Sequence, residues 1–328
     1  MKVEYKGETF ETQHYVEVSD EFREQVKALY FQKPPFENVL KEFNKIINEY
    51  GCARTNITKY YFRPIMSKVK VNKYKWCIED IFESKQLLGC CMGLIKAKPK
   101  VYKPHYPIDY AIETVLRLGG VLARKPTLFP IKTVRYLLEK YCFNGNYYDY
   151  SCGWGDRLLG AIAEGVHYYG TDPNYLLTEK LHEMNSDIVN NNFGKNKLVD
   201  IRTTGSEFFQ EDWENKMSFC FSSPPYFKLE EYQVGEQSTD KYSNYNDWLE
   251  FYLRKTIENC RRYLVDGGFF GINIKDYASY KLVEDSRKII ESLGFEFVCY
   301  EFLPVHGRPK QTGDLLENNE DIMIFKKV

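Results

Sequence analysis

Apolar residues in the second half of the chain follow two alternating patterns. Short runs rich in Tyr, Phe, Val and Ile are typical of buried strands, and apolar residues spaced three and four apart indicate amphipathic helices. These patterns predict strands at 147–151, 167–172, 198–204, 217–222, 268–274, 295–303 and 321–326. They predict helices at 132–141, 157–164, 175–190, 248–264 and 282–293. Strands that alternate with helices of this length predict an α/β, Rossmann-like, doubly wound fold with a mostly parallel sheet. Because no helix separates the last two strands, we expect the last strand to run antiparallel.

The first hundred residues have a different texture. Apolar spacing predicts helices at 36–47 and 76–88, and residues 1–30 are compatible with a short hairpin or an arm. Three prolines within residues 96–107 favour a connector. We therefore expect two parts: a smaller, basic, mainly helical N-terminal region at 1–100, and an α/β domain at 101–328.

Charge is distributed unevenly along the chain. The 328 residues carry 45 basic and 46 acidic side chains, a net charge of −1. Residues 53–135 hold 17 basic and five acidic residues, a net charge of +12, which leaves −13 for the rest. Aromatic residues interleave this basic stretch, as expected where bases stack, so nucleic acid is the predicted partner. A solvated lysine face on a structural subdomain would give the same pattern. The candidate contacts are Arg54, Lys59, Arg63, Lys68, Lys70, Lys73 and Lys75.

Composition narrows the class of protein. With 27 Tyr and 22 Phe, the chain has enough apolar area to fold, and no run approaches the ~18 apolar residues of a membrane span. The acidic N-terminal stretch lacks the pattern of a signal peptide. Nine scattered Cys fit neither a disulfide scaffold nor paired metal knuckles, and the five His are isolated. We expect a soluble, intracellular, cytoplasmic protein with reduced thiols, no metal and no membrane partner.

A Gly-x-Gly turn joins the first predicted strand of the sheet to the following helix. Gly153 and Gly155 permit positive φ and let the backbone approach a ligand that faces the helix N-terminus. Asp172, which ends the next strand, is placed to accept hydrogen bonds from ribose hydroxyls. An NAD site would want a third glycine where this chain has Leu158, whereas Asp149 supplies the acidic residue that S-adenosylmethionine sites prefer. The spacing therefore favours S-adenosylmethionine over NAD.

A second motif, Ser223-Pro224-Pro225-Tyr226, follows the predicted strand 217–222. It is expected at the carboxyl edge of the sheet, where α/β proteins bind ligands. The prolines fix φ and remove two N–H donors, so carbonyl oxygens remain free to accept. The Ser223 hydroxyl and the Pro224 carbonyl could both accept from one exocyclic NH₂, while Tyr226 offers a flat face for a base. A rigid loop that caps a strand is the alternative interpretation.

At these two motifs, residues 125–328 resemble the S-adenosylmethionine-dependent amino-group DNA methyltransferases, which modify cytosine N4 or adenine N6. Ser223, Pro224, Pro225 and Tyr226 match the family's catalytic motif. The segment 125–132 resembles the one that holds the methionine end of the cofactor, and residues 205–207 follow the third strand, where the family commonly contacts adenine. The cofactor residues that the resemblance implies are Asp149, Ser151, Gly153, Gly155, Asp172, Phe129, Pro130, Lys132, Ser206 and Glu207.

The resemblance implies methyl transfer from S-adenosylmethionine to the exocyclic amine of a flipped-out DNA base. Serine at position 223 favours cytosine N4, since Asp or Asn is commoner where adenine N6 is the target. Arg308 and Lys310, between the last two strands, are further candidates for contacting nucleic acid. Methylation of RNA or of a protein amide remains an alternative, as does an inactive nucleic-acid-binding module on the same fold. A companion restriction enzyme would fit a DNA methyltransferase, but no residue in the chain indicates one.

Overall fold

The computed structural model describes residues 1–71, 74–97, 108, 111–112, 122–194, 197–302 and 321–328. The chain forms two compact units that interleave along the sequence. The small unit contains Met1–Pro35, Thr58–Thr127 and Leu229–Val234. The large unit contains Phe36–Ile57, Leu128–Lys228 and Gly235–Val328. This division differs from the single boundary expected near residues 96–107, because residues on both sides of that boundary contribute to each unit.

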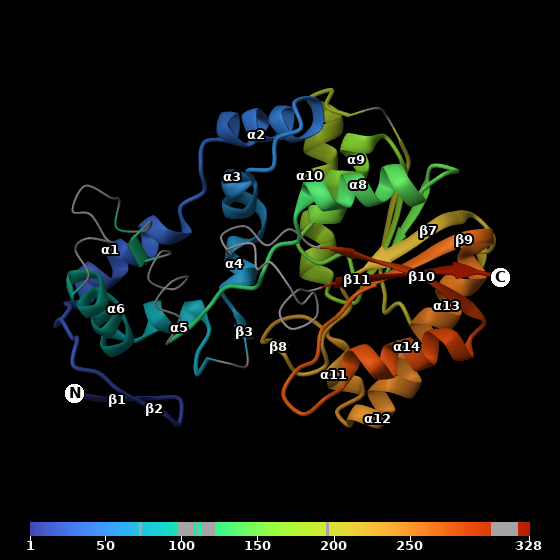
Figure 1. The fold of residues 1–328 in the computed structure, drawn as a ribbon. Coiled ribbons are helices and arrows are strands. Elements are labelled where there is room, and N and C mark those ends of the chain that lie inside the picture. Colours follow the sequence, from blue (N-terminus) through green and yellow to red (C-terminus); the bar gives the residue numbers. More distant parts are fainter. Residues whose placement is uncertain (72–73, 98–107, 109–110, 113–121, 195–196, 303–320) are drawn as a thin grey trace, which may run out of the picture. The chain divides into compact units, whose positions relative to one another are not determined.

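A seven-stranded sheet forms the centre of the large unit (Figure 1). Its strands, in spatial order, are β10 (Phe295–Phe302), β11 (Asp321–Lys327), β9 (Leu264–Asn273), β7 (Met217–Ser222), β4 (Asn146–Asp149), β5 (His167–Asp172) and β6 (Val199–Thr203). β11 is antiparallel to both of its neighbours, and the pairs from β9 to β6 are parallel. The predicted Rossmann-like sheet with an antiparallel last strand is therefore confirmed.

Helices cover both faces of this sheet (Figure 1). On one face lie α8 (Ile131–Tyr141), α9 (Asp156–Glu164) and α10 (Tyr175–Asn190). On the other lie α13 (Lys255–Tyr263) and α14 (Leu282–Ser292), and the described chain also contains η2 (Glu211–Trp213), α11 (Ser238–Lys241) and α12 (Tyr245–Asp247). The predicted helix 248–264 begins as a π-helix, η3 (Trp248–Arg254), before it continues as α13. π-Turns within helices are rare and are frequent at functional sites.

The segment that precedes the basic stretch belongs to the large unit. In α2 (Phe36–Asn48), apolar residues at three- and four-residue steps are buried, among them Val39, Phe43 and Ile46. The short helix α3 (Thr55–Ile57) follows, and the backbone N–H groups of Asn56 and Ile57 donate to the buried carboxylate of Glu42. Residues 36–57 therefore fold with the α/β sheet, although they lie far from it in sequence.

The small unit is mainly helical, as expected for the N-terminal region. It begins with the hairpin β1 (Lys2–Tyr5) and β2 (Glu8–Glu11), followed by α1 (Asp20–Phe31). The later elements are η1 (Thr58–Phe62), α4 (Arg63–Met66), β3 (Val69–Val71), α5 (Ile78–Glu83) and α6 (Lys85–Ala97). β3 pairs antiparallel with β8 (Glu230–Tyr232), which comes from the segment just after the Ser-Pro-Pro-Tyr motif. The small unit is thus completed by a strand from much later in the chain.

The predicted helix 76–88 is in fact two helices, and the second runs on through Gly89 and Gly93. These glycines serve a close approach: a Cβ at Gly89 would lie 2.5 Å from the Val16 carbonyl oxygen, and one at Gly93 would lie 2.5 Å from the His14 carbonyl carbon. Val16 N donates to the Gly89 carbonyl at 3.1 Å. Glycine is required here because residues 14–16 pass close to the helix, and local periodicity does not reveal that contact.

Candidate active site

The Gly-x-Gly turn (149–157) has the backbone that its glycines predict. Gly153 and Gly155 adopt φ of +54° and +77°, in the left-handed region that favours glycine. Helix α9 begins directly after them at Asp156. The turn therefore presents the N-terminal end of α9 at the carboxyl edge of the sheet, where α/β folds bind ligands.

Asp149 holds this turn in place through contacts of its buried carboxylate. Its side chain is fully buried, and both carboxylate oxygens lie 2.9 Å from Arg157 Nε. The Tyr168 hydroxyl donates to the same carboxylate at 2.8 Å, and the guanidinium of Arg157 also donates to the Ser151 carbonyl. A buried ion pair with these added hydrogen bonds holds the turn at both its ends.

Asp172 lies at the end of β5, beside the turn, as the sequence predicted. Its carboxylate accepts from Gly153 N at 3.1 Å and from Asn174 N at 3.0 Å. Burial raises the pKa of Asp172 to about 6, against the opposing effect of these two backbone hydrogen bonds. The group is thus an acceptor whose charge is only partly compensated by the protein.

A second buried ion pair joins residues 36–57 to the turn. Arg54 lies against Asp156 and donates to the Trp154 carbonyl at 2.9 Å, and the other Asp156 oxygen accepts from Phe129 N at 3.2 Å. Burial lowers the pKa of Arg54 and raises that of Asp156, each against the attraction of its partner. One arginine therefore braces both the turn and the segment before α8. This role was missed in the sequence, because no local pattern pairs residues 102 positions apart.

The segment before α8 and the end of β6 supply the remaining predicted cofactor residues. Phe129 and Pro130 are half-buried, and Lys132 is exposed on the first turn of α8. The ring of Phe129 packs edge-on against Phe221 of β7, with 5.5 Å between ring centroids. The structure therefore brings Phe129 and Pro130 to the same edge of the sheet as the turn.

Ser206 and Glu207 lie beyond β6, and Ser206 contacts helix α13. Ser206 is buried, with its hydroxyl 2.8 Å from Thr256 Oγ1. Burial raises the pKa of Glu207, whose buried Oε2 finds no hydrogen-bond partner among the described residues. Tyr252 of η3 is also buried, and burial raises the pKa of its phenol against the opposing effect of the Ser151 and Ser206 side chains. Sequence reasoning missed Tyr252, because a helical tyrosine does not differ from other core residues in pattern.

The Ser-Pro-Pro-Tyr loop (223–226) begins next to the turn. β7 pairs with β4, and the Ser222 hydroxyl donates to the Ser151 carbonyl at 3.2 Å. Within the loop Pro224 is buried, whereas Ser223, Pro225 and Tyr226 are half-buried. A hydrogen bond from the residue directly before the loop thus places the two sequence motifs at the ends of adjacent parallel strands.

Phe227 fixes the far end of this loop. Its φ of +49° is unusual for a residue with a bulky side chain, and its ring is 2% exposed. The ring packs against Tyr245, Trp248 and Tyr280, with centroid distances of 5.4, 5.8 and 4.9 Å. Strained backbone of this kind persists where the surroundings determine it, and it is common at functional sites.

The predicted nucleic-acid contacts fall into three groups. Arg54 and Arg63 are buried, and Arg63 donates to the Tyr30 carbonyl, so their guanidinium groups are used inside the protein instead of on its surface. Lys59, Lys68, Lys70 and Lys75 are partly or fully accessible in the small unit. Lys73, Arg308 and Lys310 lie outside the described residues. Among the described residues, the accessible candidates for contacting nucleic acid are therefore these four lysines.

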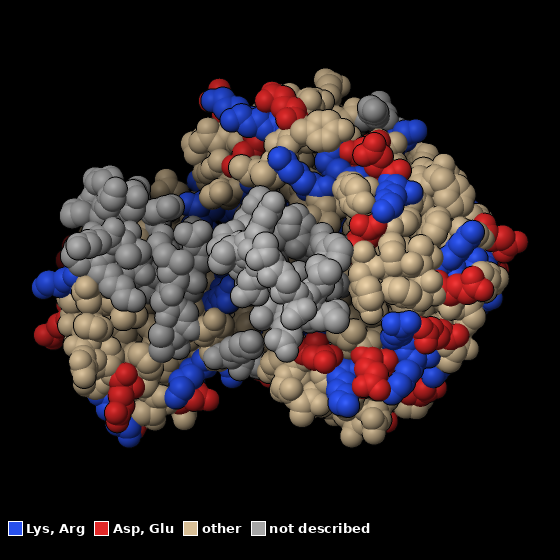
Figure 2. Space-filling view, in the orientation of Figure 1, with Lys and Arg blue, Asp and Glu red and all other residues tan. Residues whose placement is uncertain are grey.

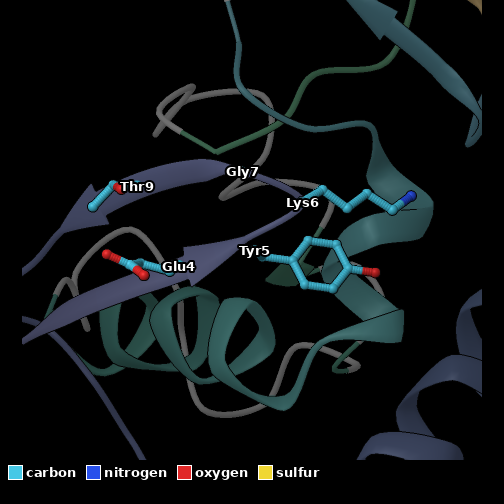
Figure 3. Close-up of a pocket in the computed structure, with 5 residues that line it drawn as sticks. All are labelled: Glu4, Tyr5, Lys6, Gly7 and Thr9. Atoms are coloured by element: carbon cyan, nitrogen blue, oxygen red, sulfur yellow. The ribbon is translucent and has the colours of Figure 1, made fainter.

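A hollow of about 330 Å³ lies beside the β1–β2 hairpin, lined by Glu4, Tyr5, Lys6, Gly7 and Thr9 (Figure 3). The ammonium of Lys6 is paired with Asp80 at 2.6 Å. None of these residues belongs to the two motifs.

In the described part of the chain, no three His, Cys, Asp or Glu side chains are grouped to hold a metal ion, and no helix has the length and apolarity to cross a membrane.

Comparison with protein families gives one match. Residues 217–327 match the model of a family described as DNA methylase. The matched range begins with β7, includes the Ser-Pro-Pro-Tyr loop and β9, and ends in β11. The family resemblance inferred from the Ser-Pro-Pro-Tyr motif is therefore confirmed over this part of the chain, and the Gly-x-Gly turn lies outside the matched range. A comparison with curated proteins gives no match.

Several solved structures resemble the chain at low identity. An S-adenosylmethionine-dependent O-methyltransferase from Thermotoga maritima is 13% identical over 65% of this chain and 69% of its own, with a TM-score of 0.39. An N1-methyltransferase from Burkholderia thailandensis, solved with S-adenosylhomocysteine, is 12% identical over 60% and 77%, with a TM-score of 0.38. The [4+2]-cyclase SpnF is 12% identical over 52% and 60%, with a TM-score of 0.38. The fold assignment itself rests on the strand order of the sheet.

Proposed function

We propose that this chain transfers a methyl group from S-adenosylmethionine to the exocyclic amine of a DNA base, with cytosine N4 preferred over adenine N6. The observation that carries the proposal is the hydrogen bond to the Gly-x-Gly turn at Ser151 from Ser222, the residue directly before the Ser-Pro-Pro-Tyr loop. A donor site and an acceptor site on adjacent strand ends are what a direct transfer between two bound molecules requires. The DNA methylase match over residues 217–327 supports the same reaction.

The residues around the turn fit S-adenosylmethionine in their chemistry. Asp172 is a buried acceptor suited to ribose hydroxyls, and the unpartnered oxygen of Glu207 suits a donor such as the adenine amine. Ser151, Gly153 and Gly155 offer backbone and hydroxyl groups at the head of α9. Asp149 is assigned an indirect role, because Arg157 and Tyr168 already occupy its carboxylate. When bound, this cofactor supplies an electrophilic sulfonium methyl group.

The Ser-Pro-Pro-Tyr loop is assigned the acceptor side. An exocyclic amine is a poor nucleophile because its lone pair is delocalised into the ring. The Ser223 hydroxyl and the Pro224 carbonyl accept its two hydrogens, which orients the lone pair out of the ring plane as positive charge develops on nitrogen. The new N–CH₃ bond forms as the S–CH₃ bond breaks, and a proton then leaves to water. Tyr226 stacks on the base, which must be flipped out or single-stranded to reach the loop.

The small unit is assigned the contacts to the nucleic-acid backbone. Lys59, Lys68, Lys70 and Lys75 are its accessible candidates. Two of them also pair with acids, Lys68 with Glu79 at 3.8 Å and Lys75 with Glu8 at 3.6 Å. Lys and Arg are interspersed with Asp and Glu over the described part of the visible face (Figure 2). We therefore expect moderate, salt-sensitive binding instead of a tight electrostatic clamp.

The test is transfer of labelled methyl from S-adenosylmethionine to DNA, followed by digestion to nucleosides. We expect label in N4-methylcytosine, with N6-methyladenine as the lesser product. Parallel reactions contain RNA and a mixed protein substrate. Label that appears only in RNA or only in protein contradicts the DNA assignment, and no label in any substrate contradicts methyl transfer altogether.

Replacing Ser223 tests the role of the loop directly. Ser223→Ala removes one of the two acceptors for the amine, and we expect methyl transfer to fall about 100-fold, the usual scale for losing one preorganised hydrogen bond in a transition state. Salt-sensitive DNA binding should remain. Ser292→Ala, at an exposed serine on the last turn of α14, is the matched control and should leave transfer unchanged. Equal rates for Ser223→Ala and the unmodified protein would contradict the assigned role.

A further inference from the structure

The phenol of Tyr226 has a buried partner outside the Ser-Pro-Pro-Tyr motif. Its hydroxyl donates to Asn273 Oδ1 at 2.8 Å. Asn273 is the last residue of β9 and is 1% exposed. β9 pairs with β7 so that Ser222 lies opposite Ile272, which brings Asn273 level with the first residue of the loop. The contact therefore links the loop to the next strand of the sheet.

An amide at this position is costly unless it has a function. The residues on either side, Ile272 and Ile274, are buried and apolar. A buried amide without hydrogen-bond partners loses free energy relative to an aliphatic side chain of the same size. Packing alone would be served by leucine, so the amide is best explained by the phenol to which it bonds.

The bond to Asn273 completes the restraint of the tyrosine. On the chain side, the next residue, Phe227, is locked by its positive φ and by the aromatic side chains around it. At the tip of the ring, Asn273 holds the hydroxyl. The ammonium of Lys275 lies 5.8 Å from the ring centroid, over one face of the ring. Backbone, tip and one face of the ring are thus each held, which fixes the plane in which the ring lies.

We propose that Asn273 is a positioning residue that acts through the Tyr226 hydroxyl to hold the ring as the stacking platform for the target base. This inference rests on the proposed function and deepens it, because it assigns the geometry of base stacking to a residue of β9. Asn273 touches neither cofactor nor base in this scheme. Its loss therefore lowers the rate of transfer at saturating DNA and leaves the affinity for S-adenosylmethionine unchanged.

A double-mutant cycle tests this proposal. Tyr226→Phe removes only the hydroxyl, Asn273→Leu removes only the acceptor, and the third variant carries both changes. We expect each single variant to lower kcat roughly 3- to 10-fold, the range for one neutral hydrogen bond, and the double variant to be no slower than either. If the two effects multiply in the double variant, or if Tyr226→Phe leaves kcat unchanged, Asn273 does not act through the phenol and the proposal is wrong.

A second readout needs no turnover. A single-stranded oligonucleotide with 2-aminopurine reports stacking by its fluorescence, and both single variants should weaken the binding-induced change by the same factor. If the unmodified protein transfers no methyl group but gives this pattern, the proposed function fails and the positioning role stands. If it gives no stacking signal, or if only one variant alters it, the positioning role fails regardless of activity. Where Asn273→Leu does not fold, Tyr226→Phe alone decides the outcome in both assays.

Discussion

The Gly-x-Gly turn and the Ser-Pro-Pro-Tyr loop lie at the same edge of one sheet, but they are held in different ways. The turn is locked by two buried ion pairs, Arg157 with Asp149 and Arg54 with Asp156. The loop is locked by two prolines, by the buried ring of Phe227 and by a neutral hydrogen bond. Removing either partner of a buried ion pair leaves the other charge uncompensated, which costs much stability. Trimming a buried apolar side chain costs stability in proportion to the atoms removed. The effects of substitutions on stability and activity should therefore differ between the two regions, both in size and in which property changes.

Breaking a charged lock should have the largest effect. Arg54→Leu leaves the carboxylate of Asp156 buried without its cation, and we expect the free energy of unfolding to fall by about 3–5 kcal/mol, measured by urea denaturation. The double variant Arg54→Leu with Asp156→Leu should recover part of this loss, because it removes the stranded charge. Lys288→Leu, which breaks the exposed pair with Glu284, is the control and should leave the denaturation midpoint unchanged. A similar loss for Arg54→Leu and Lys288→Leu would contradict the buried lock.

The pH dependence of cofactor binding should distinguish the turn from the loop. Because the pKa of Asp172 is raised to about 6, its charged form is disfavoured in the folded protein, and its contribution to stability falls as pH rises from about 4 to 6. Binding has the opposite sign, since only the ionised carboxylate accepts from both ribose hydroxyls. The affinity for S-adenosylmethionine should therefore drop about tenfold for each pH unit below 6, as measured by calorimetry.

Asp172→Asn is the control for this pH effect. Its amide does not titrate, so its weaker affinity should be nearly constant between pH 5 and 7. A variant that keeps the original pH profile would show that another group titrates. Stacking of a 2-aminopurine oligonucleotide on the loop should not follow the Asp172 titration, because the contact between Tyr226 and Asn273 does not involve that carboxylate.

Trimming the apolar lock should have the smallest effect. Phe227→Leu keeps a large apolar side chain among Tyr245, Trp248 and Tyr280 but loses the edge contacts of the ring. We expect a loss of about 1 kcal/mol in the free energy of unfolding, near the scale of a core exchange of similar volume. The rate of methyl transfer should fall by more than the loss of folded protein accounts for, and the affinity for S-adenosylmethionine should be unchanged. A loss of cofactor affinity equal to the loss of transfer would contradict the separation of the two regions.

Local pattern predicted most of the large unit. The boundaries of β5, β7 and α10 agree with the apolar runs, because a buried strand or helix carries its environment in its own periodicity. The positive φ of Gly153 and Gly155 was expected from residue type alone. The two motifs were placed correctly at strand ends for the same reason: a strand, its turn and the following helix are contiguous in sequence.

Contacts between distant segments were not predictable in this way. The basic run suggested that Arg54 and Arg63 contact a polyanion, yet both are buried inside the protein. Charge along a sequence records which residues are ionisable, but not which of them a neighbouring carboxylate or carbonyl has already engaged. The pairing of β3 with β8, in which Val71 lies opposite Glu230, likewise joins segments that are distant in sequence and share no local signal.

The sequence by itself determined the order of strands and helices, the two motifs and the resemblance that links them to methyl transfer. Each depends on residues close together in the chain, where periodicity and turn chemistry act directly. Only the tertiary structure decided that residues 36–57 brace the turn, that Tyr226 is held by Asn273, and that the units interleave. These features depend on which buried polar groups meet in the folded chain, and the packing of elements that are distant in sequence decides this.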